Sequence, residues 1–189
     1  MSVKPEIELT ADGSHTLFVP SLNEHYHSVN GAIQESNHVF IEAGLKNCLK
    51  DEIHIFEVGF GTGLNAFLTL IANKGLHKNI HYTSVESYPL SMDMVEKLNY
   101  SDKYSLQEQD SYNELHLAEW EREVQITPNF QLKKLNADFT CFDWTKLNKV
   151  DLIYFDAFAP DKQPDLWTQE IFDNLYRDSN DDAILVTYC

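Results

Sequence analysis

The amino-acid sequence predicts an α/β fold with a mainly parallel sheet, and three observations support this. Short runs rich in β-branched and aromatic residues alternate with longer segments of helical periodicity, which is typical of βαβ crossovers. The chain has 189 residues, of which 43% are hydrophobic, enough for one domain with its own core. Several short runs end at a glycine or an acidic residue. Because ligands bind at the carboxyl ends of strands in open α/β sheets, these positions indicate a binding site.

The first fifty residues predict a small appendage that precedes the main domain. Two alternating stretches flank the turn Asp12-Gly13, which indicates a β-hairpin. Apolar spacing after Gly31 indicates one or two helices. We therefore expect an N-terminal hairpin and a helical lead-in segment over residues 1–50, with strands at 6–10 and 15–19, an irregular stretch at 21–31 and helical structure at 32–49.

Residues 51–189 predict the main domain, in which strands and helices alternate. Its strands are rich in Ile, Val, Phe and Tyr, and its helices have polar and apolar faces. We expect strands at 53–58, 80–85, 130–135, 150–155 and 183–188, and helices at 64–76, 90–98, 112–124 and 165–177.

A glycine-rich turn, Gly59–Gly63, follows the first strand of this domain. It lacks the Gly-Lys-Ser/Thr ending of a phosphate-binding loop, and Leu64 stands where a dinucleotide fingerprint needs glycine or alanine. What remains is acid-x-Gly-x-Gly-x-Gly, whose acid is Glu57. Glycine lets the backbone turn sharply and approach a ligand closely. The spacing resembles the first motif of Rossmann-like methyltransferases, which bind S-adenosylmethionine (SAM); the alternative is a tight turn without a ligand.

Three further acidic residues follow predicted strands. Glu86 ends the second strand, where a carboxylate can accept hydrogen bonds from both hydroxyls of a ribose. Asp138, beside the aromatic Phe139, suits the amino group of an adenine. Asp156 follows the fourth strand, where a carboxylate can orient an acceptor amine and help remove its proton, and Phe158 can exclude water. For each acid the alternative is a purely structural role.

The remaining metal-binding residue types predict no metal site. His25 and His27 are two residues apart but lack further well-spaced ligands, so we expect a loop or packing role. The three cysteines, Cys48, Cys141 and Cys189, lie far apart and form no CxxC pair, so neither a disulfide framework nor a zinc site is expected.

Several stretches together resemble the MnmC-type methyltransferase domain. They are Glu57–Asn65, Glu86–Leu90 and Asp156–Trp167, and Asn30–Ser36 is similar to the same family. The most specific pattern is Asp-x-Phe-Ala-Pro-x-Lys-x-Pro-Asp-x-Trp, which begins at Asp156. The resemblance covers nearly the whole chain. It implies a Rossmann-like class I SAM-dependent methyltransferase fold.

The activity that the resemblance implies is SAM-dependent methylation of an amine in tRNA. The acceptor is the aminomethyl group of 5-aminomethyl-2-thiouridine, a modified wobble uridine. In this interpretation the donor site consists of residues that shape the glycine loop, hold the methionine end and the ribose, and flank the adenine. These residues are Glu57, Gly59, Gly61, Gly63, Asn65, Glu86, Asp138, Phe139 and Phe158, and Asp156 is the catalytic residue.

The resemblance also implies what the chain does not contain. Bifunctional relatives have an FAD-dependent oxidase domain that prepares the amine, and 189 residues leave no room for it. We therefore expect no FAD, and we leave a separate oxidase partner open. Family members continue with a basic segment and two more strands, so we expect the sheet to end early, at Cys189.

Charge and hydropathy bear on the partners. The chain has 14 Lys and Arg against 30 Asp and Glu, a net charge of −16. This charge disfavours a chain that clamps nucleic acid by itself, so tRNA binding should be weak and salt-sensitive. No apolar run reaches the roughly 18 residues of a membrane span, and Met1–Glu6 does not have the pattern of a signal peptide. We expect a cytoplasmic protein without membrane contact.

Two other classes of function stay open at this stage. An aminopropyltransferase of the spermidine synthase kind uses a related donor and a similar acidic loop, and its diamine acceptor would suit an acidic surface; another small-molecule methyltransferase is a related alternative. The second class is a truncated, non-catalytic module that binds SAM.

Overall fold

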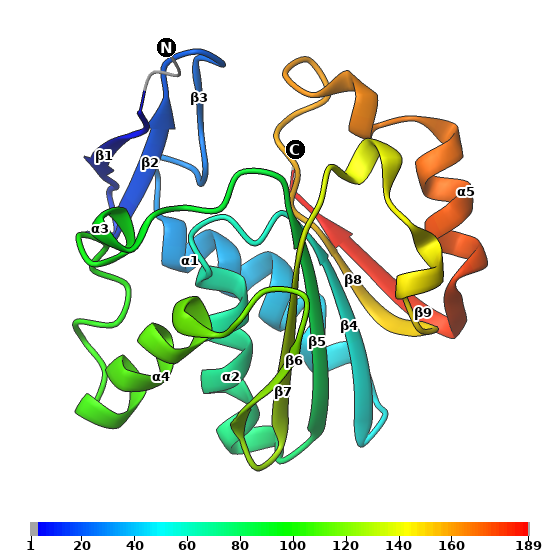
Figure 1. The fold of residues 1–189 in the computed structure, drawn as a ribbon. Coiled ribbons are helices and arrows are strands. Elements are labelled where there is room, and N and C mark those ends of the chain that lie inside the picture. Colours follow the sequence, from blue (N-terminus) through cyan, green and yellow to red (C-terminus); the bar gives the residue numbers. More distant parts are fainter. Residues whose placement is uncertain (1–3, 189) are drawn as a thin grey trace.

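A computed structural model of the chain describes residues 4–188 and contains a central six-stranded sheet (Figure 1). The strand order is β6-β7-β5-β4-β8-β9, and every neighbouring pair is parallel except β6 and β7. This confirms the α/β class and the mainly parallel sheet. The strands are β4 (Glu52–Val58), β5 (Asn79–Glu86), β6 (Glu123–Thr127), β7 (Phe130–Asn136), β8 (Val150–Phe155) and β9 (Ser179–Thr187).

A second, antiparallel sheet precedes the central one. It consists of β1 (Glu6–Leu9), β2 (His15–Val19) and β3 (Glu24–His25). The predicted hairpin is confirmed, with its turn held by Asp12, whose carboxylate accepts a hydrogen bond from the Ser14 backbone N–H at 2.8 Å. The prediction of an irregular stretch at 21–31 missed β3, which pairs with β2 over only two residues.

Helix α2 spans the predicted range 64–76, whereas several other helical segments differ from the prediction. The helices are α1 (Ala32–Ser36), α2 (Leu64–Leu76), α3 (Met92–Val95), α4 (Leu106–Leu117) and α5 (Gln169–Arg177), with a π-helical stretch at Asn37–Glu42 and short 3-10 turns at Leu45–Asn47, Phe139–Cys141, Trp144–Lys146 and Pro164–Leu166. None of the helices in the described part of the chain is long and apolar enough to cross a membrane.

The central sheet is covered on both faces (Figure 1). Residues alternate between the two faces of a strand, so Ile55 of β4 belongs to the same hydrophobic cluster as Phe67 of α2, whereas its neighbour Phe56 belongs to the cluster of Ile171 of α5. Phe40, from the stretch that follows α1, belongs to the same hydrophobic cluster as Phe67. The N-terminal region therefore shares a core with the main domain, and the boundary near residue 50 stays a prediction.

The helix predicted at 112–124 is wrong at both ends. Helix α4 begins six residues earlier because Ser105 and Glu108 form a capping box, and it ends at Leu117. Residues Glu123–Thr127 are instead the edge strand β6, paired antiparallel with β7. The alternation of Val124 and Ile126 with polar residues is a strand pattern, which the helical interpretation overrode.

Other element boundaries also differ from the predictions. The segment 90–98 forms only the four-residue α3, and 32–49 is divided among three short helical pieces. Helix α5 begins at Gln169, after Thr168 accepts a hydrogen bond from the Ile171 N–H as an N-cap. Strand β9 begins at Ser179 rather than 183, with a register shift against β8.

Candidate active site

A pocket of about 400 Å³ lies at the carboxyl ends of the central strands. Its walls come from the turn after β4, the end of β5, the loops after β7 and β8, and the N-terminal region. The predicted site residues that line it are Gly59, Gly61, Asn65, Glu86, Phe139, Asp156 and Phe158. The fold thus brings together residues nearly one hundred positions apart, as the rule for open α/β sheets predicts.

The glycine loop needs glycine at three positions. Gly59, Gly61 and Gly63 have φ angles of 92°, 48° and 70°, a region that residues with a side chain rarely adopt. A Cβ on Gly59 would stand 2.8 Å from the Asp156 carbonyl oxygen, and one on Gly61 would stand 3.1 Å from the Tyr26 ring. Gly63 does not line the pocket; it caps α2 beside His116.

Glu86 connects the end of β5 to the glycine loop. Its Oε2 accepts a hydrogen bond from the Gly61 N–H at 2.9 Å, and its Oε1 accepts one from the Tyr88 N–H at 2.7 Å. The residue is half-buried and lines the pocket. Since a carboxylate offers about four acceptor positions, Glu86 keeps capacity for two hydroxyl donors while the backbone fixes its orientation.

Asp156 lies directly after β8, beside the start of the glycine loop, and is held by Asn65. The Asn65 Nδ2–H donates to Asp156 Oδ2 at 2.7 Å, and Asn65 itself is buried near the start of α2. Loss of solvation raises the pKa of the Asp156 carboxyl to about 7; the Asn65 hydrogen bond opposes this rise, and the negative charge of Glu35 adds to it. A carboxyl with a pKa near neutrality can exchange a proton with an amine.

Glu57 lies beneath the pocket rather than on its wall. It is fully buried, and neither carboxylate oxygen has a hydrogen-bond partner among the described residues. Burial raises the pKa of this carboxyl to about 8, and the nearby charge of Asp156 contributes to the rise. Buried Tyr82 and Ser84 also carry hydroxyls without a partner in the described part of the chain. The prediction that Glu57 holds the methionine end therefore requires contact through a rearranged or hydrated site.

Asp138 is the predicted site residue that is most clearly engaged elsewhere. Its carboxylate accepts hydrogen bonds from the Thr140 N–H at 2.9 Å and the Thr140 hydroxyl at 2.7 Å. It begins the 3-10 turn that places Phe139 against the pocket, and it does not line the pocket itself. The adenine contact assigned to Asp138 stays a prediction, whereas the position of Phe139 in the wall agrees with its assigned role.

The loop that begins at Asp156 is folded back on itself. The Phe158 N–H donates to Gln163 Oε1 at 3.1 Å, and the Trp167 Nε1–H donates to the Phe158 carbonyl at 2.9 Å. Gln163 and Trp167 thus each bond to the backbone of Phe158. They hold Phe158 against the pocket.

Sequence reasoning missed the contribution of the N-terminal region. The Tyr26 ring meets Phe158 edge-on at 5.3 Å between centroids and contacts the glycine loop. Burial and the charge of Glu86 raise the pKa of the Tyr26 hydroxyl, so it stays protonated as a hydrogen-bond donor. Glu35 also lines the pocket, and burial raises its pKa. The similarity of Asn30–Ser36 to the family was the available signal for Glu35.

The two N-terminal histidines have the packing roles that the sequence suggested. His25 Nε2, on β3, lies 3.0 Å from Glu8 Oε2, on β1, so the pair spans the central strand β2 of the small sheet. His27 is buried with its Nε2 3.0 Å from the Thr62 hydroxyl, and burial lowers its pKa to about 4. A neutral His27 therefore connects the N-terminal region to the glycine loop.

The residues present fit a nucleoside ligand with a cationic end. Gly61 lets the glycine loop pass close to the Tyr26 ring at the pocket, and Glu86 offers free acceptor positions beside it. The apolar side chains of Phe139 and Phe158 line the same pocket as the acidic Asp156 and Glu35. This combination of apolar walls, hydroxyl acceptors and negative charge suits SAM.

Comparisons with known proteins agree with this geometry. A protein from Burkholderia multivorans is 31% identical over 193 residues, which is 92% of this chain and 28% of the relative. One from Aeromonas salmonicida is 29% identical over 185 residues, 86% of this chain and 27% of the relative. Both are named tRNA 5-methylaminomethyl-2-thiouridine biosynthesis bifunctional protein MnmC. The chain thus spans little more than a quarter of the length of these relatives.

A solved structure and a sequence family extend the agreement. The crystal structure of MNMC2 from Aquifex aeolicus superposes with a TM-score of 0.81 at 27% identity, over 98% of this chain and 60% of that one. This confirms the predicted Rossmann-like methyltransferase fold. A family described as S-adenosyl-L-methionine-dependent methyltransferase matches residues 78–189. Because this match covers more than half of the chain, the protein belongs to that family of SAM-dependent methyltransferases.

Proposed function

We propose that the chain methylates the primary amine of 5-aminomethyl-2-thiouridine at the wobble position of tRNA. The observation that carries the proposal is the position of Asp156, which lines the same pocket as the glycine loop and Glu86 and is held there by Asn65. The names of the relatives supply the acceptor class. The family match to methyltransferases disfavours the aminopropyltransferase alternative.

Different residues of this chain would bind the methyl donor and orient the acceptor amine. When bound, SAM supplies a methyl group on a positively charged sulfur that an amine can attack. Glu86 would accept hydrogen bonds from the ribose hydroxyls, and Gly59 and Gly61 would let the backbone approach the ligand. The negative charge of Glu35, which lines the pocket, would favour a cation there.

Asp156 would orient the amine and receive its proton. The acceptor amine is an ammonium ion near neutral pH and must lose one proton before its lone pair is free to form the new C–N bond. A carboxylate with a pKa of about 7 can take that proton, and Asn65 keeps the carboxylate in place. Phe158 and Tyr26 exclude water from this side.

The surroundings of the reaction follow from the acceptor. The primary amine must be supplied by another activity, and we leave open a separate FAD-dependent oxidase as its source. The methyl transfer itself needs SAM and no FAD. A cytoplasmic location follows from a tRNA acceptor. With a net charge of −16, binding of tRNA should be weak and sensitive to salt.

Methyl transfer from labelled SAM tests the proposal directly. We expect label in tRNA that carries the 5-aminomethyl group and none in fully modified tRNA or in putrescine. Asp156→Asn should lower turnover at least about 100-fold and keep SAM affinity within about twofold, because the Asn65 hydrogen bond can persist. Asp165→Asn, an exposed acid in the same loop that does not line the pocket, is the matched control.

The pH profile gives a second check on Asp156. Because the carboxylate is the active form, turnover should fall as pH drops below about 7. Binding of SAM with no methylation of any tRNA would contradict the proposal and favour a non-catalytic binding module. Modification of putrescine with a decarboxylated donor would favour the aminopropyltransferase.

A further inference from the structure

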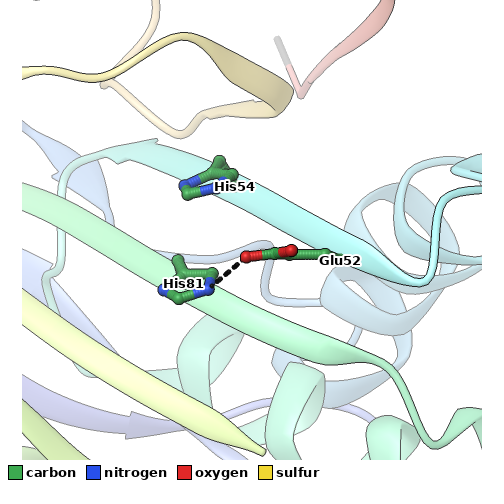
Figure 2. Close-up of side chains that lie close together, drawn as sticks. All are labelled: Glu52, His54 and His81. Carbon is green, nitrogen blue, oxygen red and sulfur yellow. Dashed lines mark hydrogen bonds and ion pairs between the residues drawn. The ribbon is translucent and has the colours of Figure 1, made fainter.

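We propose that Glu52, His54 and His81 form a binding site for a divalent transition metal of the zinc class. Each residue offers one ligand atom, and these atoms all lie within 4.8 Å of one another. Figure 2 shows the three side chains gathered over β4 and β5, with Glu52 and His81 in contact. The proposal revises the sequence-based expectation that the chain binds no metal.

Strand pairing is what brings the three residues together. His54 of β4 is the registered partner of His81 of β5, and residues paired in parallel strands point to the same face of the sheet. Their rings lie 4.5 Å apart between centroids and 9° from parallel. Glu52 lies two residues before His54, on the same face, and its Oε1 is 3.1 Å from His81 Nε2 (Figure 2).

The tautomer of His81 favours a cation at this position. His81 Nδ1 is 2.9 Å from Gln131 Oε1, so the proton of a neutral ring belongs on Nδ1, where it can donate to the amide oxygen. Nε2 then presents a lone pair toward the Glu52 carboxylate 3.1 Å away, and a metal ion bound by both groups would satisfy the two lone pairs. A hydrogen bond from the far ring nitrogen to an oxygen is also how metal-binding histidines are commonly oriented.

The donor set and its exposure suit a zinc-class ion. Two imidazole nitrogens and one carboxylate oxygen form a set that zinc takes in sites with an open fourth position for water. Tetrahedral bonds of about 2.0–2.1 Å require ligand atoms about 3.3 Å apart. Glu52 and His81 already lie 3.1 Å apart, so only separations near the 4.8 Å limit must close, by up to about 1.5 Å. The side chains of His81 and Glu52 are 36% and 64% exposed, which leaves them free to rotate.

The neighbourhood and the distance from the pocket define what the site can do. A small hollow at His54 and His81 is also lined by Lys133 and Lys146. The Lys146 ammonium group is 3.4 Å from the Glu121 carboxylate. The cluster lies near the amino ends of the strands, whereas the pocket begins at Val58; four residues of strand separate His54 from Val58 by about 13 Å. A bound ion would therefore join β4 to β5 and stabilise the sheet without touching the methyl-donor site.

Calorimetric titration of the untagged chain with Zn²⁺ tests the proposal. We expect one ion per chain with micromolar affinity, and at least tenfold weaker binding in His54→Gln and in His81→Gln. His25→Gln is the matched control because His25 also pairs with a glutamate, Glu8, at 3.0 Å. That variant should keep zinc affinity within about twofold, and zinc should raise Tm in it but not in His54→Gln.

Every outcome decides the proposal. It is overturned if the intact chain binds no zinc at micromolar concentration, if His54→Gln and His81→Gln bind as tightly as the unchanged chain, or if His25→Gln loses binding equally. Glu52→Gln serves as a second variant should either histidine change disturb folding, which circular dichroism would reveal. Because SAM titration of the same samples is measured separately, failure of the metal site and failure of the proposed methyltransferase function are distinguishable.

Discussion

The two ends of strand β4 place glutamates in opposite environments. Glu52, at the amino end, has a side chain that is 64% exposed, whereas Glu57, five residues later, is fully buried. At the carboxyl end, backbone conformation fixes the site, through Gly59 at φ 92° and through Glu86 on two backbone N–H groups. At the amino end, strand register alone gathers exposed side chains. The first kind of site leaves a local motif in the sequence, and the second does not.

The largest expected effect concerns the pH dependence of stability. The pKa of Glu57 is raised to about 8 in the folded protein from an unfolded value of 4.5, so the folded state binds an extra proton between these values. The free energy of unfolding should therefore fall by about 1.4 kcal/mol per pH unit as pH rises from 4.5 to 8. Glu57→Gln should remove this part of the slope and stabilise the protein at pH 8. Urea unfolding across this pH range measures it.

The exposed end of the same strand supplies the control for this experiment. Glu52→Gln changes the same side chain in a solvated position and should leave the slope between pH 4.5 and 8 as it is. An equal change of slope in both variants, or none in Glu57→Gln, would contradict the assignment of a protonated Glu57 beneath the pocket.

The next effect comes from the backbone of the glycine loop. Gly59→Ala would place a Cβ 2.8 Å from the Asp156 carbonyl oxygen at a φ that alanine disfavours. Such strain costs about 1–3 kcal/mol. Relief of the clash would move the glycine loop away from the loop that begins at Asp156. We expect lower stability and at least tenfold weaker SAM binding by calorimetry.

Gly75→Ala is the matched change at the other end of α2. A Cβ there meets nothing within 4 Å, and the position is helical, so alanine should stabilise the protein by up to about 1 kcal/mol. SAM affinity should stay unchanged in this variant. If Gly59→Ala behaved like Gly75→Ala, the close approach of the two loops would not be needed for the site.

Local rules explain how much of the site could be predicted. The glycine turn, Glu86 and Asp156 all stand directly after strands, where the α/β fold places ligands, so sequence position alone indicated them. Asp138 also follows a strand, yet its carboxylate turns to Thr140, two residues on, as aspartates at turns often do. Tyr26 could not be predicted from any local pattern because packing of the N-terminal sheet brings it to the pocket.

The fold was predictable for the same reason, and the prediction failed where two local signals competed. The largely buried strands β4, β5 and β8 are rich in β-branched and aromatic residues, and their positions were predicted to within one residue. The segment around Val124 fits both a helix and an alternating strand. Pairing with β7, which no local window contains, decides for the strand.

The smallest expected effect is a difference in SAM affinity between variants at the two ends of the sheet. Glu86→Gln removes the negative charge beside the glycine loop. It also turns an amide NH2 toward the N–H of Gly61 or Tyr88, where an acceptor is needed. SAM affinity should fall about tenfold, or 1.4 kcal/mol, in calorimetric titration. Glu52→Gln, about the length of β4 away, should leave SAM affinity within twofold. A loss in Glu52→Gln as large as that in Glu86→Gln would mean that the two ends are coupled through the sheet, and the picture of two independent sites would then be wrong.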